Sequence, residues 1–272
     1  MSVISINHLT RDYGSGKGIF DLSISVDSGE VFGFLGPNGA GKTTTIRHLM
    51  GFIKPQKGSC EIDGKSCWEK RDKIQERLGY IPGEISFFDD MTGKEFLKFN
   101  LEYRNLKDDS RMKEMVERFE LDPKGKIKKM SKGTKQKLGI VAAFMNNPDI
   151  IILDEPTSGL DPLMQNRFIE LIEEEKKKNK TILLSSHMFE EVERTCNRIG
   201  IIRNGKLVTV DSVETLRNRH MRTYTVQLEN TEAAQSFAND FDGICNGNQV
   251  KVVARQGLES IFMNYYGGKD ND

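Results

Sequence analysis

The sequence lacks any hydrophobic run long enough to cross a membrane. Its apolar segments, such as residues 138–145 and 150–153, fall well short of the roughly 18 consecutive apolar residues that a membrane-spanning helix needs. It also lacks internal repeats and low-complexity tracts. We therefore expect a soluble chain that cannot itself form a pathway through a membrane.

An excess of charge of one sign is also absent. Lysine plus arginine and aspartate plus glutamate each total 40, so the formal net charge is zero. Because the chain has no long basic tract, it offers no general footprint for nucleic acid, and no nucleic-acid partner is expected. Partner choice must therefore come from local surfaces.

Cysteine is scarce, and its spacing shows no pairing. The four cysteines, at positions 60, 67, 196 and 245, form none of the close pairs typical of zinc sites, and we expect no secretory leader before them. Reduced cytosolic thiols are the simplest interpretation. A chain of 272 residues fits one large domain, or one domain with a modest appendage, and excludes two equal enzymes in tandem.

What the sequence does contain is a glycine-rich loop between a strand and a helix. The loop, residues 36–43, follows a predicted strand at 30–35 and leads into a helix-compatible stretch at 43–49. Its glycines and proline let successive backbone N–H groups point inward at a triphosphate, with the positive end of the helix behind them. Lys42 is expected to meet the β and γ phosphates, and the Thr43 hydroxyl to bind Mg²⁺. The residues predicted to hold the nucleotide here are Gly36, Pro37, Asn38, Gly39, Ala40, Gly41, Lys42, Thr43 and Thr44.

A pair of carboxylates follows a fully apolar strand at residues 150–153. Asp154 and Glu155 are thereby placed at the carboxyl edge of a parallel sheet, where ligands bind in open α/β folds. Asp154 is expected to hold Mg²⁺ through water, and Glu155 to orient or deprotonate the water that attacks the γ phosphate. The alternative is that both acids only cap the next turn, together with Pro156.

The remaining periodicity predicts an α/β protein with a helical insertion and a small tail. Strands are expected at 3–8, 19–26, 59–62 and 181–185, and helices in the stretch 91–119, from residue 131 to 145, and at 162–178. After residue 205 the composition becomes more polar, with strands at 223–228 and 249–253 on either side of a helix at 232–241. Residues 256–266 suggest a short amphipathic helix without assigned chemistry.

Residues 130–138 carry a specific resemblance. Met130-Ser131-Lys132-Gly133 followed by Lys135-Gln136-Lys137-Leu138 resembles the signature motif of ATP-binding cassette (ABC) proteins, in a variant form common among bacterial exporters. Residues 158–161 resemble the family's D-loop, residues 185–187 its switch histidine, and Tyr13 its adenine-stacking aromatic. The resemblance implies a P-loop NTPase ABC cassette, with a mixed β core and a helical subdomain, at 1–204 (insertion at about 85–147). A small α+β C-terminal extension is expected at 205–272.

The resemblance also implies roles for single residues. Ser131 and Gly133 would form a second anion site that closes over the γ phosphate held by a partner cassette, so a dimer of this chain with itself or a similar cassette is implied. Taken alone, Ser131 reads as an ordinary helix N-cap. His187 would sense the γ phosphate, although a histidine after a strand is usually structural. Tyr13 would stack on adenine or is merely an exposed loop tyrosine. Asp161 would bridge the dimer or only start the helix that Pro162 opens.

Two departures from the family pattern stand out. The family usually has glutamine directly after the stretch that matches residues 80–82, where it touches Mg²⁺ and relays the nucleotide state; this chain has Gly83 and then Glu84. Either Glu84 takes over that contact or the relay is weaker. Lys132 and Thr134 occupy the third and fifth signature positions, whereas Ser131 and Gly133 are retained.

The function implied by the resemblance is that of an ATPase subunit, using ATP and Mg²⁺, that energises a separately encoded multispanning membrane permease. It would act at the cytoplasmic face of the membrane, and analogy with drug, bacitracin and lantibiotic exporters implies export. One alternative is a soluble ABC ATPase acting on ribosomes or DNA, but such members carry two cassettes or a long coiled coil. Another is a resistance module that binds a toxic ligand through residues 205–272. The transported molecule is not encoded in this chain.

Overall fold

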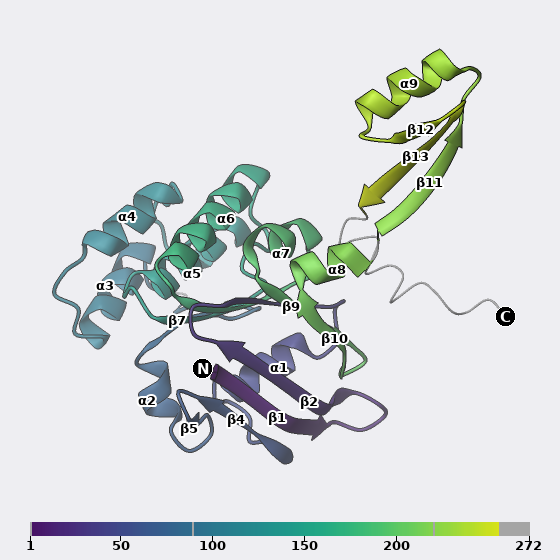
Figure 1. The fold of residues 1–272 in the computed structure, drawn as a ribbon. Helices are drawn as coiled ribbons and strands as arrows, with labels where there is room; N and C mark the ends of the chain where they lie inside the picture. The colour runs from purple at the N-terminus through teal and green to yellow at the C-terminus, as the bar shows by residue number, and fades with distance from the viewer. Residues whose placement is uncertain (1, 89, 220, 256–272) are drawn as a thin grey trace. The chain divides into compact units, whose positions relative to one another are not determined.

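The strand that precedes the glycine loop lies inside a six-stranded sheet (Figure 1). In spatial order the strands are β10 (Lys206–Ser212), β9 (Arg198–Arg203), β3 (Val31–Leu35), β8 (Thr181–Ser186), β7 (Ile150–Asp154) and β6 (Leu78–Ile81). β3 is parallel to β8 and β9, and β7 is parallel to β8 and β6. Every residue of β3, β7 and β8 is buried, as expected for parallel strands covered on both faces.

A second sheet is antiparallel, and its strands come from the first part of the chain. Its order is β2 (Gly18–Asp27), β1 (Ser2–Asp12), β4 (Lys57–Ile62) and β5 (Lys65–Ser66). The helix after the glycine loop, α1 (Lys42–Leu49), contacts strands of both sheets, and Ile46 and Leu49 belong to one buried core with Ile6 of β1 and Ile152 of β7. The phosphate loop is thus fixed between two layers.

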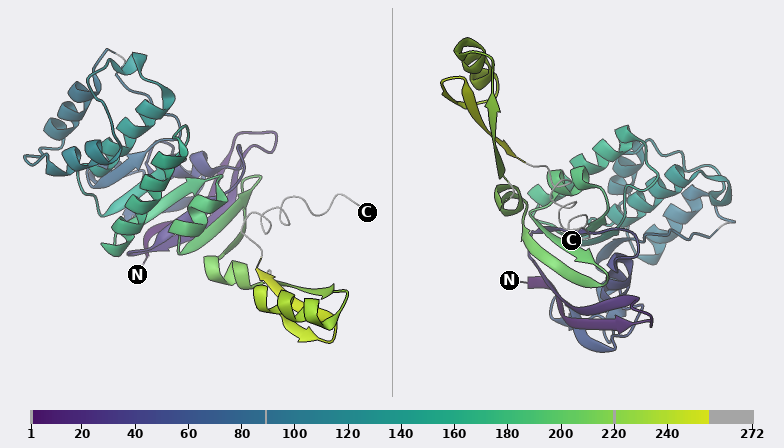
Figure 2. Two further views of the ribbon diagram at one scale, coloured as in Figure 1. Left: turned by 90° about the horizontal axis from the view of Figure 1, so that it is seen from above. Right: turned by 90° about the vertical axis from the view of Figure 1, so that its right-hand side faces the viewer.

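The helical insertion follows a short helix, α2 (Arg71–Gln75), and strand β6. The stretch expected to be helical at 91–119 forms two helices, α3 (Gly93–Tyr103) and α4 (Ser110–Arg118), and both contact α5 (Lys132–Phe144). A 3-10 turn at Ile127–Lys129 precedes α5. In both views of Figure 2 these helices, blue to teal, form a group separate from the purple strands of the antiparallel sheet.

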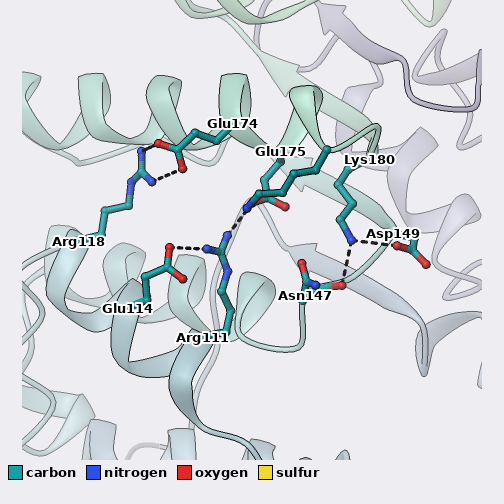
Figure 3. A network of polar contacts seen from close by, with 9 residues as sticks. Arg111, Glu114, Arg118, Asn147, Asp149, Glu174, Glu175 and Lys180 are labelled. Atoms are coloured by element: carbon teal, nitrogen blue, oxygen red, sulfur yellow. Dashed lines mark hydrogen bonds and ion pairs between the residues drawn. The ribbon is translucent and has the colours of Figure 1, made fainter.

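Ion pairs attach the insertion to α6 (Pro162–Lys177), the helix that follows β7 (Figure 3). Arg118 of α4 donates two hydrogen bonds to Glu174, at 2.7 and 2.9 Å. Arg111 of α4 bonds the buried Glu175 at 2.6 Å. The position of the insertion therefore depends on charged contacts as well as on apolar packing.

The computed structural model describes residues 2–88, 90–219 and 221–255 and divides the chain into two units, Met1–Val210 and Asp211–Asp272. The boundary that we expected after residue 204 lies before β10, a strand that pairs with β9 and therefore belongs mostly to the first unit. The helix α7 (Phe189–Thr195) and the strands β6, β9 and β10 were not predicted as elements.

The second unit is a small α+β structure considered by itself. It contains α8 (Val213–Arg219), β11 (Met221–Gln227), α9 (Thr231–Asp240), β12 (Ile244–Asn246) and β13 (Gln249–Arg255). Its antiparallel sheet has the order β11-β13-β12, and Ala234 and Ala238 of α9 pack with Val250 of β13. The predicted strand, helix and strand are found, and β12 is an addition. The helix predicted at 256–266 lies outside the described residues.

The four cysteines are free, and three of them are buried. Burial raises the pKa of the Cys60 and Cys196 thiols to about 12, so both stay protonated and unreactive near neutral pH. No helix in the described part of the chain combines the length and the apolar character that crossing a bilayer requires.

Candidate active site

A cavity of about 780 Å³ in the first unit gathers most of the predicted site residues. It forms because β3, β6, β7 and β8 are parallel, so the segments that follow their carboxyl ends meet at one edge of the sheet. Glu155 and Glu84 reach it from the segments after β7 and β6. The predicted residues that line it are Tyr13, Pro37, Asn38, Gly39, Gly41, Lys42, Thr43, Thr44, Glu84 and Glu155.

The glycine loop has the backbone geometry that a phosphate cradle requires. Gly41 has φ of +112° and caps α1 without any side-chain hydrogen bond, so the first N–H groups of the helix are left to a ligand. A Cβ atom at Gly36 would lie 2.6 Å from the carbonyl oxygen of Ile202, so no larger residue fits there. Ala40 is buried beneath the loop. The loop therefore fits an anion bound by backbone N–H groups and the helix end.

Lys42, Glu155 and His187 form a continuous chain of contacts. The Lys42 ammonium is almost fully buried; it donates to the carbonyl oxygens of Gly36 at 2.6 Å and Pro37 at 3.1 Å and lies 3.1 Å from one Glu155 oxygen. The other Glu155 oxygen is hydrogen-bonded to Nδ1 of His187. A carboxylate held between a cation and an imidazole can accept a proton in a fixed direction.

Glu155 is held in an uncommon backbone conformation. Its φ of +51° lies in the left-handed region, which costs free energy for a residue other than glycine. Its N–H donates to Ser185, to the carbonyl oxygen at 3.1 Å and the hydroxyl at 3.2 Å. The end of β8 thus compensates the strain and aims the Glu155 side chain.

Asp154 is fully buried at the end of β7. One carboxylate oxygen accepts a hydrogen bond from the Ser185 hydroxyl at 2.5 Å, and the other, Oδ2, has no hydrogen-bond partner in the described structure. A Cβ atom at Gly83 would lie 2.9 Å from that Oδ2. An unpaired buried carboxylate oxygen fits a hard cation reached directly or through water.

The donor set agrees with a cation that keeps other ligands. Among the described residues, no group of three or more His, Cys, Asp or Glu side chains could hold a metal ion alone. Mg²⁺ usually takes one or two protein oxygens and completes its shell with water and substrate phosphates. Thr43 and Asp154 fit that pattern, and Glu84 is an exposed residue at the cavity edge.

The signature segment packs against the loop after β7. Ser131 caps α5 by accepting a hydrogen bond from the Thr134 N–H at 3.1 Å, and a Cβ atom at Gly133 would lie 2.8 Å from the carbonyl oxygen of Gly159. The buried Gln136 donates to the carbonyl oxygen of Pro156 at 2.6 Å. The helix start and this loop are therefore one rigid surface.

Several predicted residues are not among those that line the cavity. The predicted residues outside the set of described residues that line it are Gly36, Ala40, Ser131, Gly133, Asp154, Asp161 and His187. Asp161 caps α6, accepting a hydrogen bond from the Met164 N–H at 3.0 Å. The capping interpretations of Ser131 and Asp161 are thus confirmed as contacts, while their roles across a dimer stay predictions.

Tyr13 lies at the cavity with 52% of its surface exposed. The guanidinium of Arg11 lies over its ring, 5.1 Å from the centroid. Because one face is covered by a cation, the ring is oriented and can offer its other face to a base.

The sequence interpretation missed five polar residues that line the cavity: Lys17, Arg47, Tyr80, Lys132 and Ser158. Arg47 stands four residues after Thr43 on α1, so helical spacing could have placed it on the same face. Tyr80, Lys132 and Ser158 also line the cavity, and the Lys132 ammonium donates to the Ser158 hydroxyl at 2.9 Å. Burial, together with the nearby charge of Asp154, raises the pKa of Tyr80 to about 12, so its hydroxyl keeps its proton. Lys132 and Ser158 belong to the signature and D-loop stretches, so the resemblance could have suggested both, whereas only the assembled fold reveals Tyr80.

Comparison with known proteins gives consistent matches. A family model described as "ABC transporter" matches residues 19–158. The bacitracin transport ATP-binding protein BcrA of Bacillus licheniformis is 38% identical over 236 residues, covering 86% of this chain and 77% of that protein. An uncharacterized ABC transporter ATP-binding protein of Methanocaldococcus jannaschii is 37% identical over 270 residues, covering 96% and 98%. The solved structure of an ATP binding subunit of an ABC transporter superposes with a TM-score of 0.72 at 30% identity, covering 80% of this chain and 93% of that one.

Proposed function

Because this chain belongs to the family of ABC transporter ATP-binding proteins, we propose that its ATP hydrolysis drives export through a separate multispanning membrane permease. The chain binds ATP and hydrolyses it, as ABC cassettes do. The permease, the direction of transport and the peripheral position at the cytoplasmic face are the proposed part. The observation that carries them is the similarity to a bacitracin transport ATP-binding protein over most of both chains.

We assign the binding of the triphosphate to the glycine loop and Lys42. The backbone N–H groups of residues 38, 39 and 41–44 and the N-terminal end of α1 hold the phosphates, and Lys42 exchanges its loop carbonyl contacts for phosphate oxygens. Tyr13 stacks on the adenine. Thr43 and Asp154 are the residues that would hold Mg²⁺, which when bound neutralises phosphate charge.

We assign the activation of the attacking water to Glu155. Its carboxylate is fixed by Lys42 on one side and His187 on the other. When Lys42 turns to the phosphates, Glu155 is freed to accept a proton from water, and the His187 contact keeps it oriented. The left-handed backbone conformation of Glu155 restricts the orientations available to its side chain.

A head-to-tail dimer follows from the location of the signature. Ser131 is exposed at the start of α5 and, like Gly133, lies outside the described cavity lining of its own chain. A helix start presents N–H groups and the positive end of the helix dipole, so this one can bind an anion beside the Ser131 hydroxyl, which is hydrogen-bonded to Thr134 within its own chain. The nucleotide of a second copy, or of a similar cassette, supplies that ligand.

The partner can be tested by affinity purification of a Glu155→Gln variant. Tagged protein is recovered from detergent-solubilised membranes of the source organism with ATP present, because blocked hydrolysis holds the closed dimer. A multispanning protein recovered in stoichiometric amount supports the proposal, and Lys42→Ala serves as the nucleotide-free control. Recovery only of ribosomes or DNA-bound factors contradicts it.

The direction of transport needs a separate measurement. In inside-out membrane vesicles the cassettes face the medium, so added ATP reaches them directly. An exporter then accumulates labelled peptide antibiotic, with bacitracin as the first probe, inside the vesicles. ATP-driven loss of a preloaded solute from the vesicles indicates import and overturns the proposed direction.

A further inference from the structure

Glu191 is a buried carboxyl group that the proposed ATPase mechanism does not use. It lies on α7, four residues after His187, and only 2% of its surface is exposed. One of its oxygens, Oε1, has no hydrogen-bond partner in the described structure. Carboxylates are rarely buried without a cation or a full set of donors, so its position calls for an explanation.

The contacts of Glu191 fix the residues on both sides of His187. The Ser186 hydroxyl donates to Glu191 Oε2 at 2.5 Å, and the Met188 N–H donates to the same Ser186 oxygen at 2.9 Å. The residues directly before and after His187 are thus held by one hydroxyl, and Glu191 decides where the proton of that hydroxyl points. The imidazole between them is hydrogen-bonded to Glu155.

Glu191 also faces the loop that follows Glu155. A cavity of about 90 Å³ is lined by Thr157, Met188, Glu190 and Glu191. That volume holds water, and the polar lining gives water partners for the unpaired Oε1. The Thr157 hydroxyl contacts the Met188 sulfur at 3.8 Å, so the two loops that carry Glu155 and His187 meet beside Glu191.

We propose that Glu191 is a positioning residue for ATP hydrolysis: through Ser186 it fixes the turn that holds His187 against Glu155. This inference rests on the proposed roles of Glu155 and His187. The ionised carboxylate is the active form, because it accepts the Ser186 proton and leaves the Ser186 oxygen free to receive the Met188 N–H. Glu191 touches neither the nucleotide nor the attacking water in this role.

The charge state of Glu191 changes near neutral pH. Burial raises its pKa to about 7; the hydrogen bond from Ser186 opposes that shift, and the negative charge of Glu155 adds to it. The other titratable groups around it are Glu190 on the same helix, the protonated Cys196 at the end of α7, and Lys176 of α6, which donates to the Thr195 carbonyl oxygen at 3.1 Å. Acidification therefore protonates Glu191 and weakens its hold on the turn.

The test is Glu191→Gln, which keeps the size of the side chain and an accepting oxygen but carries no charge. At about pH 8 its kcat for ATP is expected to fall about tenfold, with KM for ATP unchanged because the glycine loop is not touched. At about pH 6 the wild type itself is largely protonated at Glu191, so the difference between the two proteins shrinks. Glu190→Gln, a change at the neighbouring position, is the matched control and should keep the wild-type profile.

Stability gives a second readout with a defined sign. The pKa of Glu191 is raised in the folded state, so folding binds a proton between the unfolded and folded pKa values, and stability falls as pH rises through that window. Glu191→Gln removes this slope, so its Tm exceeds that of the wild type at about pH 8 even though its kcat is lower. If Glu191 has only a structural role, Glu191→Gln lowers the Tm, and nucleotide titration shows a loss of active sites equal to the loss of kcat.

The outcomes separate the two proposals. A Glu191→Gln protein with wild-type kcat at every pH overturns the positioning role while leaving the ATPase assignment intact. Full turnover by Glu155→Gln overturns the proposed role of Glu155, whatever Glu191 does. Ser186→Ala should copy the kcat loss of Glu191→Gln, since it removes the hydroxyl through which Glu191 acts, and an unchanged kcat there also counts against the inference.

Discussion

Glu155 is the residue on which the hydrolysis mechanism depends most directly. Glu155→Gln keeps the shape of the side chain but replaces one carboxylate oxygen with an NH2 group and removes the negative charge between Lys42 and His187, so turnover should fall by roughly 10²- to 10⁴-fold. ATP binding should be retained, because the loop at 36–44 is unchanged. Steady-state turnover and ATP affinity measured on the same preparation check this, and full turnover would contradict the role of general base.

Gly83 stands where the family usually has glutamine, and it lies beside Asp154. A Cβ atom there would lie 2.9 Å from Asp154 Oδ2, the oxygen that has no partner. Gly83→Ala should displace this carboxylate and raise the Mg²⁺ concentration for half-maximal ATPase activity severalfold, without changing Mg²⁺-independent nucleotide binding. A magnesium titration of activity measures it.

Glu84→Gln is the companion variant. If Glu84 takes over the cation contact of the missing glutamine, the Mg²⁺ requirement of this variant rises as much as that of Gly83→Ala. Glu84 is exposed at the cavity edge, so we expect little change in the Mg²⁺ requirement. A larger shift for Glu84→Gln than for Gly83→Ala would contradict the special place of Gly83 beside Asp154.

At the scale of single residues, the sequence indicated which residues belong to the site but not which of them contact one another. Motif spacing predicted Lys42, Glu155 and His187, but their chain of contacts exists only because β3, β8 and β7 are neighbours in the sheet. Strand order depends on tertiary packing, which no local pattern contains. Tyr80 was missed for the same reason, since its place at the cavity depends on the pairing of β6 with β7.

Among the elements, the start of α5 is joined to the loop after β7 by one buried hydrogen bond. Gln136→Ala would leave the Pro156 carbonyl oxygen without its donor at 2.6 Å, at a cost of about 1–3 kcal/mol in the free energy of unfolding. Because that helix start carries the signature, ATPase activity should also fall under conditions in which the variant is still folded. Urea denaturation and turnover test both, with Lys135→Ala as the neighbouring control expected to be near neutral.

The link between α4 and α6 makes a second element-scale prediction. Arg111→Met leaves the buried Glu175 with only the Lys178 contact at 2.8 Å, so it should cost about 3 kcal/mol of stability, somewhat less if Lys178 compensates. Arg118→Met should cost about 1 kcal/mol or less, because its partner Glu174 is 45% exposed. Chemical denaturation at neutral pH ranks the two variants, and equal costs would contradict the importance of burial.

Acidic pH should remove the contribution of the Arg118–Glu174 pair to stability. The hydrogen bond from Arg118 lowers the pKa of Glu174, so the stability of that pair is present above the unfolded pKa of glutamate and is lost as pH falls through the lower folded value. The cost of Arg118→Met should therefore disappear in acid.

For the molecule as a whole, the class of fold was predicted from the sequence, whereas the boundary expected after residue 204 differs from the division of the structure at residue 210. Polar composition after residue 205 suggested an extension, yet the segment from 206 forms β10 beside β9. No residue of β10 is fully buried, whereas every residue of β7 is, so this edge strand looks less apolar than the central ones and its segment resembled an extension. Composition reflects the average burial of a segment, so it does not identify a strand that pairs with a neighbour on one side only.

The position of this boundary can be tested by truncation. A chain ending at residue 210 keeps residues 206–210 of β10, including Leu207 and Val210, which pack against the main core, and should fold cooperatively with intrinsic ATPase activity close to that of the full chain. A chain ending at 204 loses those contacts and also Gly205, whose N–H donates to the Ala40 carbonyl oxygen of the phosphate loop at 2.9 Å. It should therefore bind ATP more weakly and unfold at a lower temperature. Equal thermal stability and equal ATP affinity of the two truncations would place the boundary at 204 after all, since β10 would then contribute nothing to the nucleotide site.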